Sequence, residues 1–345
     1  MSKPAVAFVW RRLPPPHFLG GAERSAQILG TELAKNGWRV FHVGTRELPW
    51  ASETFGRVYG LHDHSVPYRW NKQDIYDLPQ AEIVPTLEHL IKAQNVRCVV
   101  TSHEGSDDIV RIARARGAKT IGWLHSVTSS GLSVLRGDPD LALAVSSFVK
   151  NSALPHCSGN LELFYPAFEQ VAGQRPRSPF PEVMMVGAIP EKGLDLTLAL
   201  ARALPNIQFV IVEGWYQSTL PKIGNLKYIP RGPLSDYYDS SWLLIVPSKA
   251  DEGFGRVAVE ASLRKRPVLA SNRGGLPEAV SHIPECLVDT DKLDRWLPRM
   301  TRILNDQPYA DQLTLRLNAG AQSFSRSPVP EFERFVNRLV LSASS

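Results

Sequence analysis

The stretch Asp251-Glu252-Gly253-Phe254-Gly255-Arg256-Val257-Ala258-Val259-Glu260 holds two carboxylates eight positions apart. Two glycines allow a sharp turn beside the first carboxylate, and an apolar run with helical spacing, Val257–Leu263, leads to and past the second. We therefore expect Glu252 in a loop and Glu260 about two turns down the following helix. Backbone N–H groups at a helix start attract phosphate, and a carboxylate beyond them can accept hydrogen bonds from sugar hydroxyls. The stretch thus predicts a site for a ligand that has both a phosphate and sugar hydroxyls, as a sugar nucleotide does.

Composition narrows the class of protein. The chain has 345 residues, which suits two domains, and its 43% hydrophobic and 21% charged content is ordinary for a globular protein. The formal net charge of +5 is spread along the chain and is not gathered in a tail or stripe. This balance suits an anionic ligand and does not predict nucleic acid as a partner. These features leave the oligomeric state open.

The three cysteines, Cys98, Cys157 and Cys286, are odd in number and lack CxxC spacing. They predict reduced thiols in a cytoplasmic protein and neither disulfides nor a metal site. The apolar run Ala5–Trp10 is too short for a signal peptide, and no segment approaches the ~20 apolar residues of a membrane-spanning helix. We therefore expect any membrane contact to be peripheral, at the inner face of a membrane.

Short apolar runs rich in Val, Ile and Phe alternate with helical patterns, which predicts an α/β fold with mainly parallel sheets. In the first half we expect strands at Ala5–Trp10, Trp38–Thr45, Cys98–His103, Thr120–His125 and Ala142–Ser146. The expected helices there are Ala22–Asn36, Pro85–Gln94 and Asp107–Arg116, the first ending at Gly37.

A proline-rich segment at residues 166–181 interrupts this alternation and predicts a linker between domains 1–165 and 182–328. In the second half we expect strands at Val183–Gly187, Phe209–Glu213, Leu243–Pro247 and Val268–Ser271. The expected helices are Leu194–Ala203, Arg256–Arg266, Leu293–Leu304, Ala310–Phe324 and Pro330–Ser342.

Loops that follow predicted strands carry candidate ligand-binding groups. Gly21, in Gly20-Gly21-Ala22-Glu23, opens a helix and would let the backbone approach a phosphate, with a flexible turn as the alternative. Lys192, in Val186-Gly187-Ala188-Ile189-Pro190-Glu191-Lys192-Gly193, would supply a point charge for phosphate or be a solvated loop lysine. His125 and His103 each lie at the end of a predicted strand. Each histidine would either donate a hydrogen bond to a ligand hydroxyl or have a purely structural role.

Two further segments have a structural interpretation as well as a functional one. Gly274-Gly275-Leu276-Pro277-Glu278 is a glycine turn that leads into a short helix, with Glu278 as a cap. Three basic residues on one predicted helix form either a solvated face or a surface for an anionic lipid acceptor. These residues are Arg111, Arg114 and Arg116.

Taken together, these motifs resemble the GT-B retaining glycosyltransferases of family four, the glycosyl transferases group 1. The resemblance runs over nearly the whole chain, and it lies in the order and spacing of the blocks more than in any one of them. The matching blocks are Gly20–Arg24, Leu33–Val40, Trp123–Ser126, Val186–Gly193, Val246–Ser248, Glu252–Gly255, Val259–Ala261, Arg266–Ala270 and Gly274–Glu278.

The resemblance implies a GT-B fold, with two Rossmann-like domains facing each other across a cleft. The first domain would face the acceptor, and the second would bind a nucleotide diphosphate-sugar. The end of the chain, residues 329–345, would form a helix that crosses back to the first domain. The implied reaction moves the sugar to an acceptor hydroxyl with retention, by a front-face route, without cofactor or divalent metal. A UDP-sugar is favoured over a GDP-sugar, and the acceptor is an unidentified glycan, lipid-linked compound or small molecule.

Specific roles come from the same resemblance. Lys192 would contact the diphosphate, and Glu260 would bind the ribose hydroxyls. Glu252 would hydrogen-bond the transferred sugar, and His125 would contact that sugar near its 6-hydroxyl; these two are the catalytic candidates. The other donor-binding positions would be Gly21 and the helix-start segment Gly253, Phe254, Gly255, Arg256 and Val257.

The chain departs from the family pattern at two positions. Ala188 stands where the family often has an arginine that is paired with the lysine, so Arg231 or Arg256 would have to supply that charge. Ser126 follows His125 where the family has an aspartate.

Two other classes of protein stay open. A sugar-nucleotide epimerase or an inverting GT-B enzyme would share the architecture, but the spacing of Glu252 and Glu260 counts against both. A non-catalytic protein that binds anions or nucleic acid is suggested only by the basic composition. The even spread of charge and the lack of aromatic-basic RNA motifs count against that class.

Overall fold

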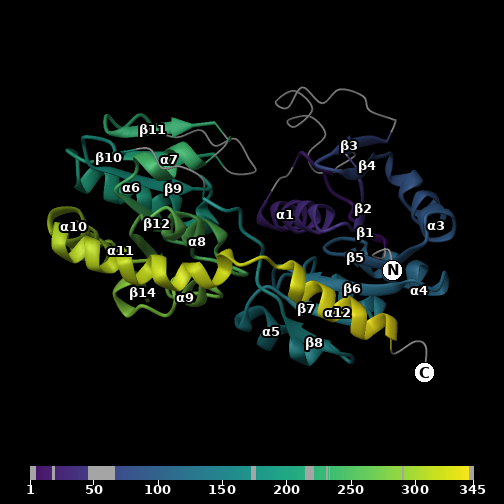
Figure 1. Cartoon of the computed structure of the whole chain (residues 1–345). Helices are drawn as coiled ribbons and strands as arrows, with labels where there is room; N and C mark the ends of the chain where they lie inside the picture. The colour runs from purple at the N-terminus through teal and green to yellow at the C-terminus, as the bar shows by residue number, and fades with distance from the viewer. Residues whose placement is uncertain are drawn as a thin grey trace. The chain divides into compact units, whose positions relative to one another are not determined.

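The computed structural model describes residues 5–17, 20–45, 67–171, 176–213, 221–230, 232, 234–289 and 291–341. The chain forms two compact units (Figure 1). The first unit contains the described residues of Met1–Ala167 and Ser327–Ser345, and the second contains those of Phe168–Arg326.

The described part of the first unit is built on one eight-stranded sheet with the order β3-β4-β2-β1-β5-β6-β7-β8. Neighbouring strands are parallel except for β3, which is antiparallel to β4. The strands are β1 (Ala5–Val9), β2 (Arg39–Gly44), β3 (Tyr68–Trp70), β4 (Gln73–Asp77), β5 (Val96–Thr101), β6 (Lys119–Leu124), β7 (Leu141–Ala144) and β8 (Leu161–Leu163).

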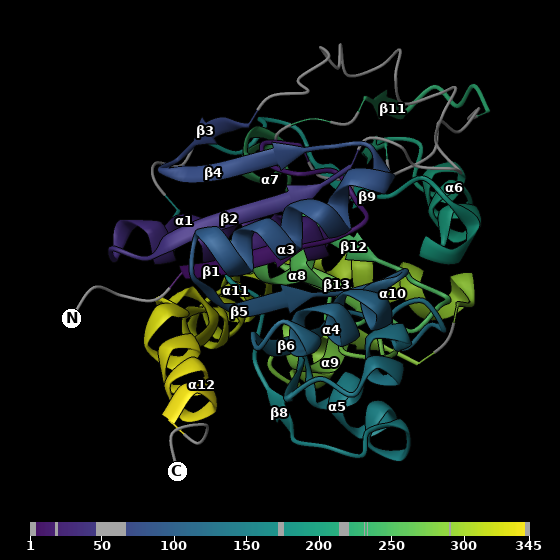
Figure 2. The same cartoon turned by 90° about the vertical axis from the view of Figure 1, so that its right-hand side faces the viewer.

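Helices cover both faces of this sheet, as parallel strands require. Figures 1 and 2 show α1 on one face and α3 and α4 on the other. The helices of the first unit are α1 (Gly21–Lys35), α3 (Ile83–Ala93), α4 (Ser106–Ala115), α5 (Ser147–Ala153) and α12 (Val329–Leu341).

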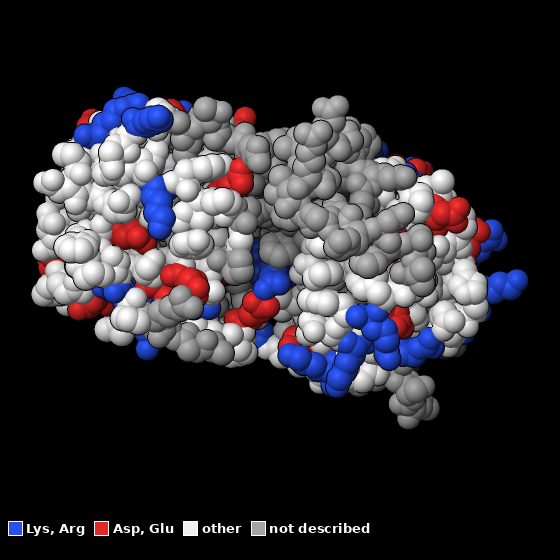
Figure 3. Space-filling model, turned by 90° about the horizontal axis from the view of Figure 1, so that it is seen from above, with Lys and Arg blue, Asp and Glu red and all other residues white. Residues whose placement is uncertain are grey.

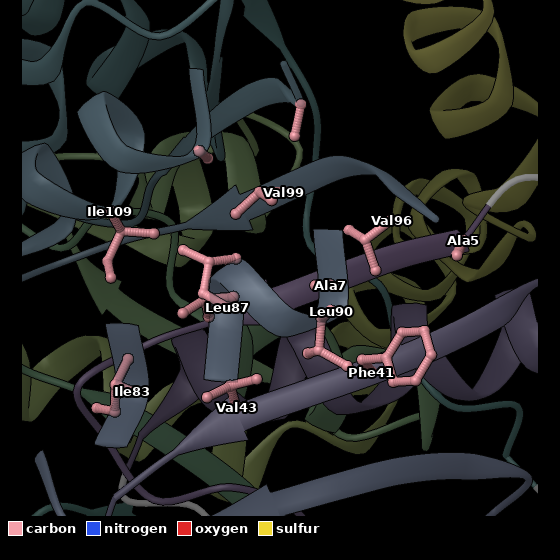
Figure 4. Close-up of a cluster of buried hydrophobic side chains, with 13 residues drawn as sticks. Ala5, Ala7, Phe41, Val43, Ile83, Leu87, Leu90, Val96, Val99 and Ile109 are labelled. Carbon is pink, nitrogen blue, oxygen red and sulfur yellow. The ribbon is translucent and has the colours of Figure 1, made fainter. Parts of the chain in front are cut away.

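A buried apolar cluster joins α3 and α4 to the sheet (Figure 4). Ile83, Leu87 and Leu90 recur at helical spacing on α3, and they meet Phe41 and Val43 of β2, among others. Each of these side chains is at most 2% exposed. Alternating apolar positions on the strands and an apolar stripe on the helix therefore form the core of this layer.

The helix α12 belongs to the first unit although it ends the chain. Phe332 and Phe335 are fully buried, and both pack against Phe164. Trp38, which directly precedes β2, donates a hydrogen bond from Nε1 to Glu333 at 2.8 Å. Aromatic burial and this bond hold the helix on the first unit.

The described part of the second unit has a six-stranded, all-parallel sheet with the order β11-β10-β9-β12-β13-β14. Its strands are β9 (Glu182–Val186), β10 (Gln208–Val212), β11 (Leu226–Ile229), β12 (Leu243–Val246), β13 (Val268–Ser271) and β14 (Leu287–Val288). Its helices are α6 (Leu194–Ala203), α7 (Ser235–Ser240), α8 (Arg256–Leu263), α9 (Leu276–Ala279), α10 (Leu293–Asn305) and α11 (Gln307–Ala321).

The α/β architecture predicted from the sequence is confirmed, and each predicted strand lies within two residues of an observed one at both ends. Gly37 ends α1 with φ +84, as a left-handed residue after a helix does. The helix predicted to run to Arg266 was too long, because α8 ends at Leu263 and Lys265 has φ +56. The short strands β3, β4, β8, β11 and β14 and the helices α5 and α7 were not predicted.

Candidate active site

Two loops meet at the carboxyl end of the second unit's sheet. The strands β9 and β12 are neighbours in the sheet, so the loops that follow them emerge side by side. The loop after β9 contains Lys192, and the loop after β12 contains Glu252. Ligands of open α/β sheets bind outside the carboxyl ends of the strands, so the chain order places both residues where such a site forms.

Lys192 and Glu252 form an ion pair, with 2.5 Å between Nζ and Oε1. Ser248 donates a second hydrogen bond to the same carboxylate oxygen. The side chain of Glu252 is 15% exposed, and that of Lys192 is 38% exposed. Burial raises the pKa of Glu252, but the charge of Lys192 and the two hydrogen bonds outweigh burial and lower the pKa below its ordinary value. Glu252 is therefore an ionised carboxylate at neutral pH.

Backbone contacts fix the two loops against each other. Gly193 has φ +82, and a Cβ at this position would lie 2.0 Å from the carbonyl oxygen of Pro247. The amide of Lys249 donates to the carbonyl of Glu191 at 2.9 Å. Only glycine permits the close approach of residue 193 to the carbonyl of Pro247. The spacing between the two loops therefore depends on Gly193.

A glycine turn, Gly274-Gly275, packs against the loop that contains Glu252. The amide of Gly275 donates to the carbonyl of Glu252 at 2.7 Å. A Cβ at Gly274, which has φ +57, would lie 2.3 Å from the carbonyl oxygen of Glu252, and one at Gly275 would lie 2.4 Å from that of Gly253. The glycine turn thus has a packing role, and it leads into α9, the short helix that the sequence predicts.

The loop ends in the start of α8, whose N-cap is Gly255 with φ +96. Because α8 begins at Arg256, Glu260 lies just over one turn into the helix and not about two turns, as the sequence had suggested. Phe254 is 4% exposed and packs against Phe168 and Phe324. The buried ring of Phe254 anchors the start of α8. Gly253 precedes Phe254 in the loop, and Val257 is the second residue of the helix.

Glu260 is held by two side chains. Tyr238 Oη donates to one carboxylate oxygen at 3.0 Å, and Arg256 Nη2 donates to the other at 3.1 Å. The guanidinium of Arg256 also lies 4.4 Å from the centroid of the Phe168 ring. Arg256 is therefore engaged with Glu260 in this structure. Ala188 is fully buried and offers no charge, and Arg231 lies outside the described residues.

Two other sequence candidates, Gly21 and His125, lie in the first unit. Gly21 is the exposed first residue of α1, and Glu23 accepts a hydrogen bond from the amide of Gly20 at 3.1 Å. Arg12 donates to Glu23 at 3.1 Å and to Glu104 at 3.1 Å. The glycine loop is thus tied through one arginine to the loop after β5.

The two histidines follow neighbouring strands, β5 and β6, and their rings stack with centroids 5.9 Å apart. Trp10 packs against both, at 6.0 Å from His103 and 5.8 Å from His125. His103 is buried, with φ +65. Burial and then the charge of Arg12 hold the pKa of His103 well below its usual value, so this ring is neutral at pH 7.

The basic residues predicted on one helix are paired with acids on the surface. Arg111 contacts Asp107 and Asp108, Arg114 contacts Asp138, and Arg116 contacts Glu88. Figure 3 shows basic and acidic side chains intermixed on each unit in the face that it presents. This pairing favours the solvated-face alternative.

Two constraints concern metals and membranes. Within the described ranges, no three His, Cys, Asp or Glu side chains are gathered so that they could hold a metal ion. The described helices include none with the length and apolar character to cross a membrane.

Sequence reasoning missed Ser248, Tyr238 and Arg12. Ser248 had a signal, since it directly follows the predicted strand Leu243–Pro247 at the same sheet edge as Lys192. Tyr238 lies in α7, a helix of six residues without clear periodicity, and its contact with Glu260 joins positions 22 residues apart. Arg12 is one of two adjacent arginines after the first predicted strand, and the local pattern does not indicate its carboxylate partners.

The second unit resembles a known protein family in sequence. Residues 169–317, nearly the whole second unit, match the model of the family described as glycosyl transferases group 1. The match covers less than half of the 345-residue chain, and it agrees with the resemblance that the order of its motifs had indicated.

Among curated relatives, the chain is 33% identical over 146 residues to D-inositol 3-phosphate glycosyltransferase of Mycolicibacterium smegmatis. That alignment covers 37% of this chain and 33% of the relative. The alignment to the relative from Rhodococcus opacus is longer, covering 72% of this chain and 54% of that protein at 27% identity. The chain thus spans about a third to about half the length of these relatives.

A solved structure confirms the GT-B fold over the whole chain. Sucrose-phosphate synthase from Thermosynechococcus elongatus has a TM-score of 0.78 at 19% identity, with 99% of this chain and all of that chain covered. At this identity, the likeness establishes the fold.

Proposed function

We propose that the chain is a retaining glycosyltransferase that moves a sugar from a nucleotide diphosphate-sugar to an acceptor hydroxyl without a divalent metal. The observation that carries the proposal is the ion pair between Lys192 and Glu252. It joins two loops 60 residues apart at the carboxyl end of a parallel sheet, within the segment that matches the glycosyltransferase family. A fixed cation beside a fixed, ionised carboxylate suits a ligand that has both a diphosphate and a sugar.

The hard step is the separation of the sugar from the diphosphate, so stabilisation of the leaving group is the largest contribution expected of the protein. Lys192 would provide a full positive charge, and the amides at the start of α8 would provide partial positive charge. The ammonium of Lys192 has three donors and uses one on Glu252, so it can hold the carboxylate and a phosphate oxygen together. These groups replace the charge that a metal would supply.

Glu252 would accept hydrogen bonds from hydroxyls of the transferred sugar. Its carboxylate is already engaged by Lys192 and Ser248, which fixes its position and weakens it as a nucleophile. We therefore assign it a binding and orienting role. Glu260 would bind the ribose hydroxyls of the same donor.

In the front-face route, the bond between the anomeric carbon and the phosphate oxygen breaks while the acceptor oxygen forms its bond on the same face. The acceptor proton passes to the departing phosphate oxygen, and a nucleoside diphosphate is released. Gly21 would allow the backbone to approach the donor phosphate, and His125 would contact the sugar near its 6-hydroxyl.

The donor nucleotide is proposed to be UDP. The structure of HepE from Anabaena in complex with UDP-glucose has a TM-score of 0.74 to this chain at 15% identity, over 98% of this chain and 99% of that chain. This likeness supports the choice of UDP.

The test is a transfer assay with UDP-, GDP- and ADP-sugars and a panel of glycan, lipid-linked and small-molecule acceptors, with EDTA throughout. We expect one donor to be consumed only when an acceptor is present, and we expect proton NMR to show a product with the anomeric configuration of the donor. An inverted product would indicate an inverting enzyme. Conversion of the donor to an isomer without acceptor would indicate an epimerase.

A further inference from the structure

Buried donors fix both carboxylate oxygens of Glu260. Tyr238 Oη lies 3.0 Å from Oε2, and Arg256 Nη2 lies 3.1 Å from Oε1. Tyr238 is 2% exposed and the Arg256 side chain is 11% exposed, whereas the side chain of Glu260 is 27% exposed. The carboxylate is thus held by the protein and still accessible to a ligand.

We infer that Tyr238 and Arg256 are positioning residues that orient Glu260 toward a ribose diol and thereby make the site select ribonucleotides over deoxyribonucleotides. This inference rests on the proposed function, because it concerns the nucleotide half of the same donor. It adds two residues and a specificity to the expected role of Glu260.

The number of hydrogen-bonding positions matches a vicinal diol. An ionised carboxylate offers about four acceptor positions, and Tyr238 and Arg256 occupy two of them. Two positions remain, and a ribose presents two adjacent O–H donors. A deoxyribose leaves one of these positions without a partner.

Tyr238 is suited to be a permanent donor. Burial, and then the charge of Glu260 and the hydrogen bond to it, raise the pKa of Tyr238 well above its usual value, so the hydroxyl keeps its proton at any physiological pH. The backbone around it is also fixed, because Ser241 Oγ and Arg266 Nε each donate to the carbonyl of Tyr238 at 3.0 Å.

Arg256 is oriented by an aromatic surface. Its guanidinium lies 4.4 Å from the centroid of the Phe168 ring, and Phe168 packs in turn against the buried Phe254. A planar guanidinium combines stacking with directed hydrogen bonds, which a lysine ammonium cannot do. The arginine therefore directs one carboxylate oxygen of Glu260, and Tyr238 directs the other.

Selectivity follows from the cost of an unmatched polar group. A site built to hydrogen-bond a hydroxyl rejects an analogue that lacks it, because the polar group of the protein loses its partner. Since Glu260 is partly exposed, water recovers some of this loss, and we expect a preference of about tenfold. If Tyr238 no longer holds the carboxylate, Glu260 can turn toward water and the preference shrinks.

The experiment begins with calorimetric titration of UDP, GDP and ADP into the full wild-type chain. The diphosphate that binds most tightly is then compared with its 2′-deoxy and 3′-deoxy analogues in wild type and in Tyr238→Phe, Arg256→Lys and Glu260→Gln. Tyr237→Phe removes a hydroxyl from the adjacent residue of α7 and is the matched control.

We expect wild type and Tyr237→Phe to prefer the ribonucleotide by about tenfold over at least one analogue, and Tyr238→Phe by about threefold or less. Arg256→Lys is expected to behave like Tyr238→Phe, and Glu260→Gln to lose the preference. In Tyr238→Phe, affinity for the deoxy analogue should stay within about twofold of the wild-type value. A structural defect would instead weaken the ribonucleotide and the deoxy analogue equally.

A Tyr238→Phe variant with the full wild-type preference overturns the inference, as does one that weakens the ribonucleotide and its analogues by the same factor. If Tyr238→Phe does not fold, Arg256→Lys gives the same decision. A wild-type chain that binds none of the three diphosphates contradicts the proposed function, whereas a chain that binds one without preferring ribose contradicts this inference alone.

Discussion

Both units place a cation beside carboxylates at the carboxyl end of a sheet, but the two cations differ in availability. In the second unit, Lys192 is 38% exposed and paired with Glu252. In the first unit, the Arg12 side chain is 9% exposed and shared between Glu23 and Glu104. A cation buried between two carboxylates is neutralised and holds loops together, whereas an exposed cation with one such partner can still bind a phosphate.

The difference follows from local chemistry. Arg12 has a planar fork of donors that can reach two carboxylates in fixed directions. Lys192 has a flexible stem, and Gly187 with φ +93 leaves room for it, since a Cβ there would lie 3.3 Å from Lys192 Cγ. We therefore expect the same pairing of charges to serve the fold in one unit and, under the proposed function, a ligand in the other.

The strongest test of this contrast removes the available cation. In Lys192→Met, we expect kcat/KM for sugar transfer to fall by roughly a thousandfold, because stabilisation of the leaving diphosphate is lost. The midpoint of thermal unfolding should fall less than in Arg12→Met, because the side chain of Glu252 is 15% exposed whereas that of Glu23 is 3% exposed. Steady-state kinetics and thermal unfolding of the same preparation measure both.

Lys249 is the matched control for this change. It lies in the loop after β12, its side chain is 35% exposed, and it is paired with Asp195 at 2.6 Å. Lys249→Met should retain activity within about threefold of wild type. Equal losses in the two variants would show that general charge, and not the position of Lys192, supports the reaction.

Removal of the buried cation should instead affect stability. In Arg12→Met, Glu23 keeps its hydrogen bond from the Gly20 amide but loses its positively charged partner in a nearly dry environment. We expect the free energy of unfolding to fall by about 3 kcal/mol. Urea unfolding of the full chain measures this. Arg111→Met, at a surface residue whose side chain is 53% exposed, should change it by less than about 1 kcal/mol. A small effect at Arg12 would remove the contrast between the two cations.

A pH series sharpens the contrast. His42 lines the same small cavity as Arg12 and Glu23, and burial lowers its pKa to about 4. The unfolded chain therefore binds a proton on His42 from about pH 6.5 downward while the folded chain does not. Stability should fall by about 3 kcal/mol between pH 6.5 and pH 4 and then level off for this group.

His42→Asn should flatten this slope in urea unfolding at several pH values. The lowered pKa of Glu252 acts in a lower window, since its contribution is present above the unfolded pKa and is lost as pH falls through the folded pKa. A wild-type chain whose stability is constant from pH 7 to pH 4 would contradict the assignment of a buried neutral His42.

The smallest of these effects concerns Ser248. It donates to Glu252, so Ser248→Ala should loosen the carboxylate and lower kcat by about tenfold with little change in the affinity for a nucleoside diphosphate. Steady-state kinetics measures kcat, and calorimetry of the same variant measures the affinity for the nucleoside diphosphate. Loss of diphosphate affinity without loss of kcat would place Ser248 on the phosphate and not on Glu252.

The fold was largely predictable because central strands such as β1 and β12 are continuous apolar runs, and the helices between the strands have clear spacing. The edge strands β3, β8 and β14 were not, because they have two or three residues each. Such short pieces are strands only through their neighbours, and a local pattern does not record those neighbours.

The candidate site was predictable where function constrains a short motif, as with the spacing from Glu252 to Glu260 and the glycines around Lys192. It was not predictable where the partner comes from elsewhere in the chain. Tyr238 reaches Glu260 from a six-residue helix, and Arg12 joins two loops 92 residues apart through its contact with Glu104. Only the three-dimensional structure brings such pairs together.

The central claim is that Lys192 binds the donor diphosphate while Glu252 faces the sugar. Calorimetric titration of UDP, GDP and ADP into wild type, Lys192→Met and Glu252→Gln tests it most directly. We expect Lys192→Met to bind the preferred diphosphate at least about tenfold more weakly. Glu252→Gln should bind it as well as wild type or more tightly, because a competing carboxylate is removed. Unchanged affinity in Lys192→Met would contradict the claim.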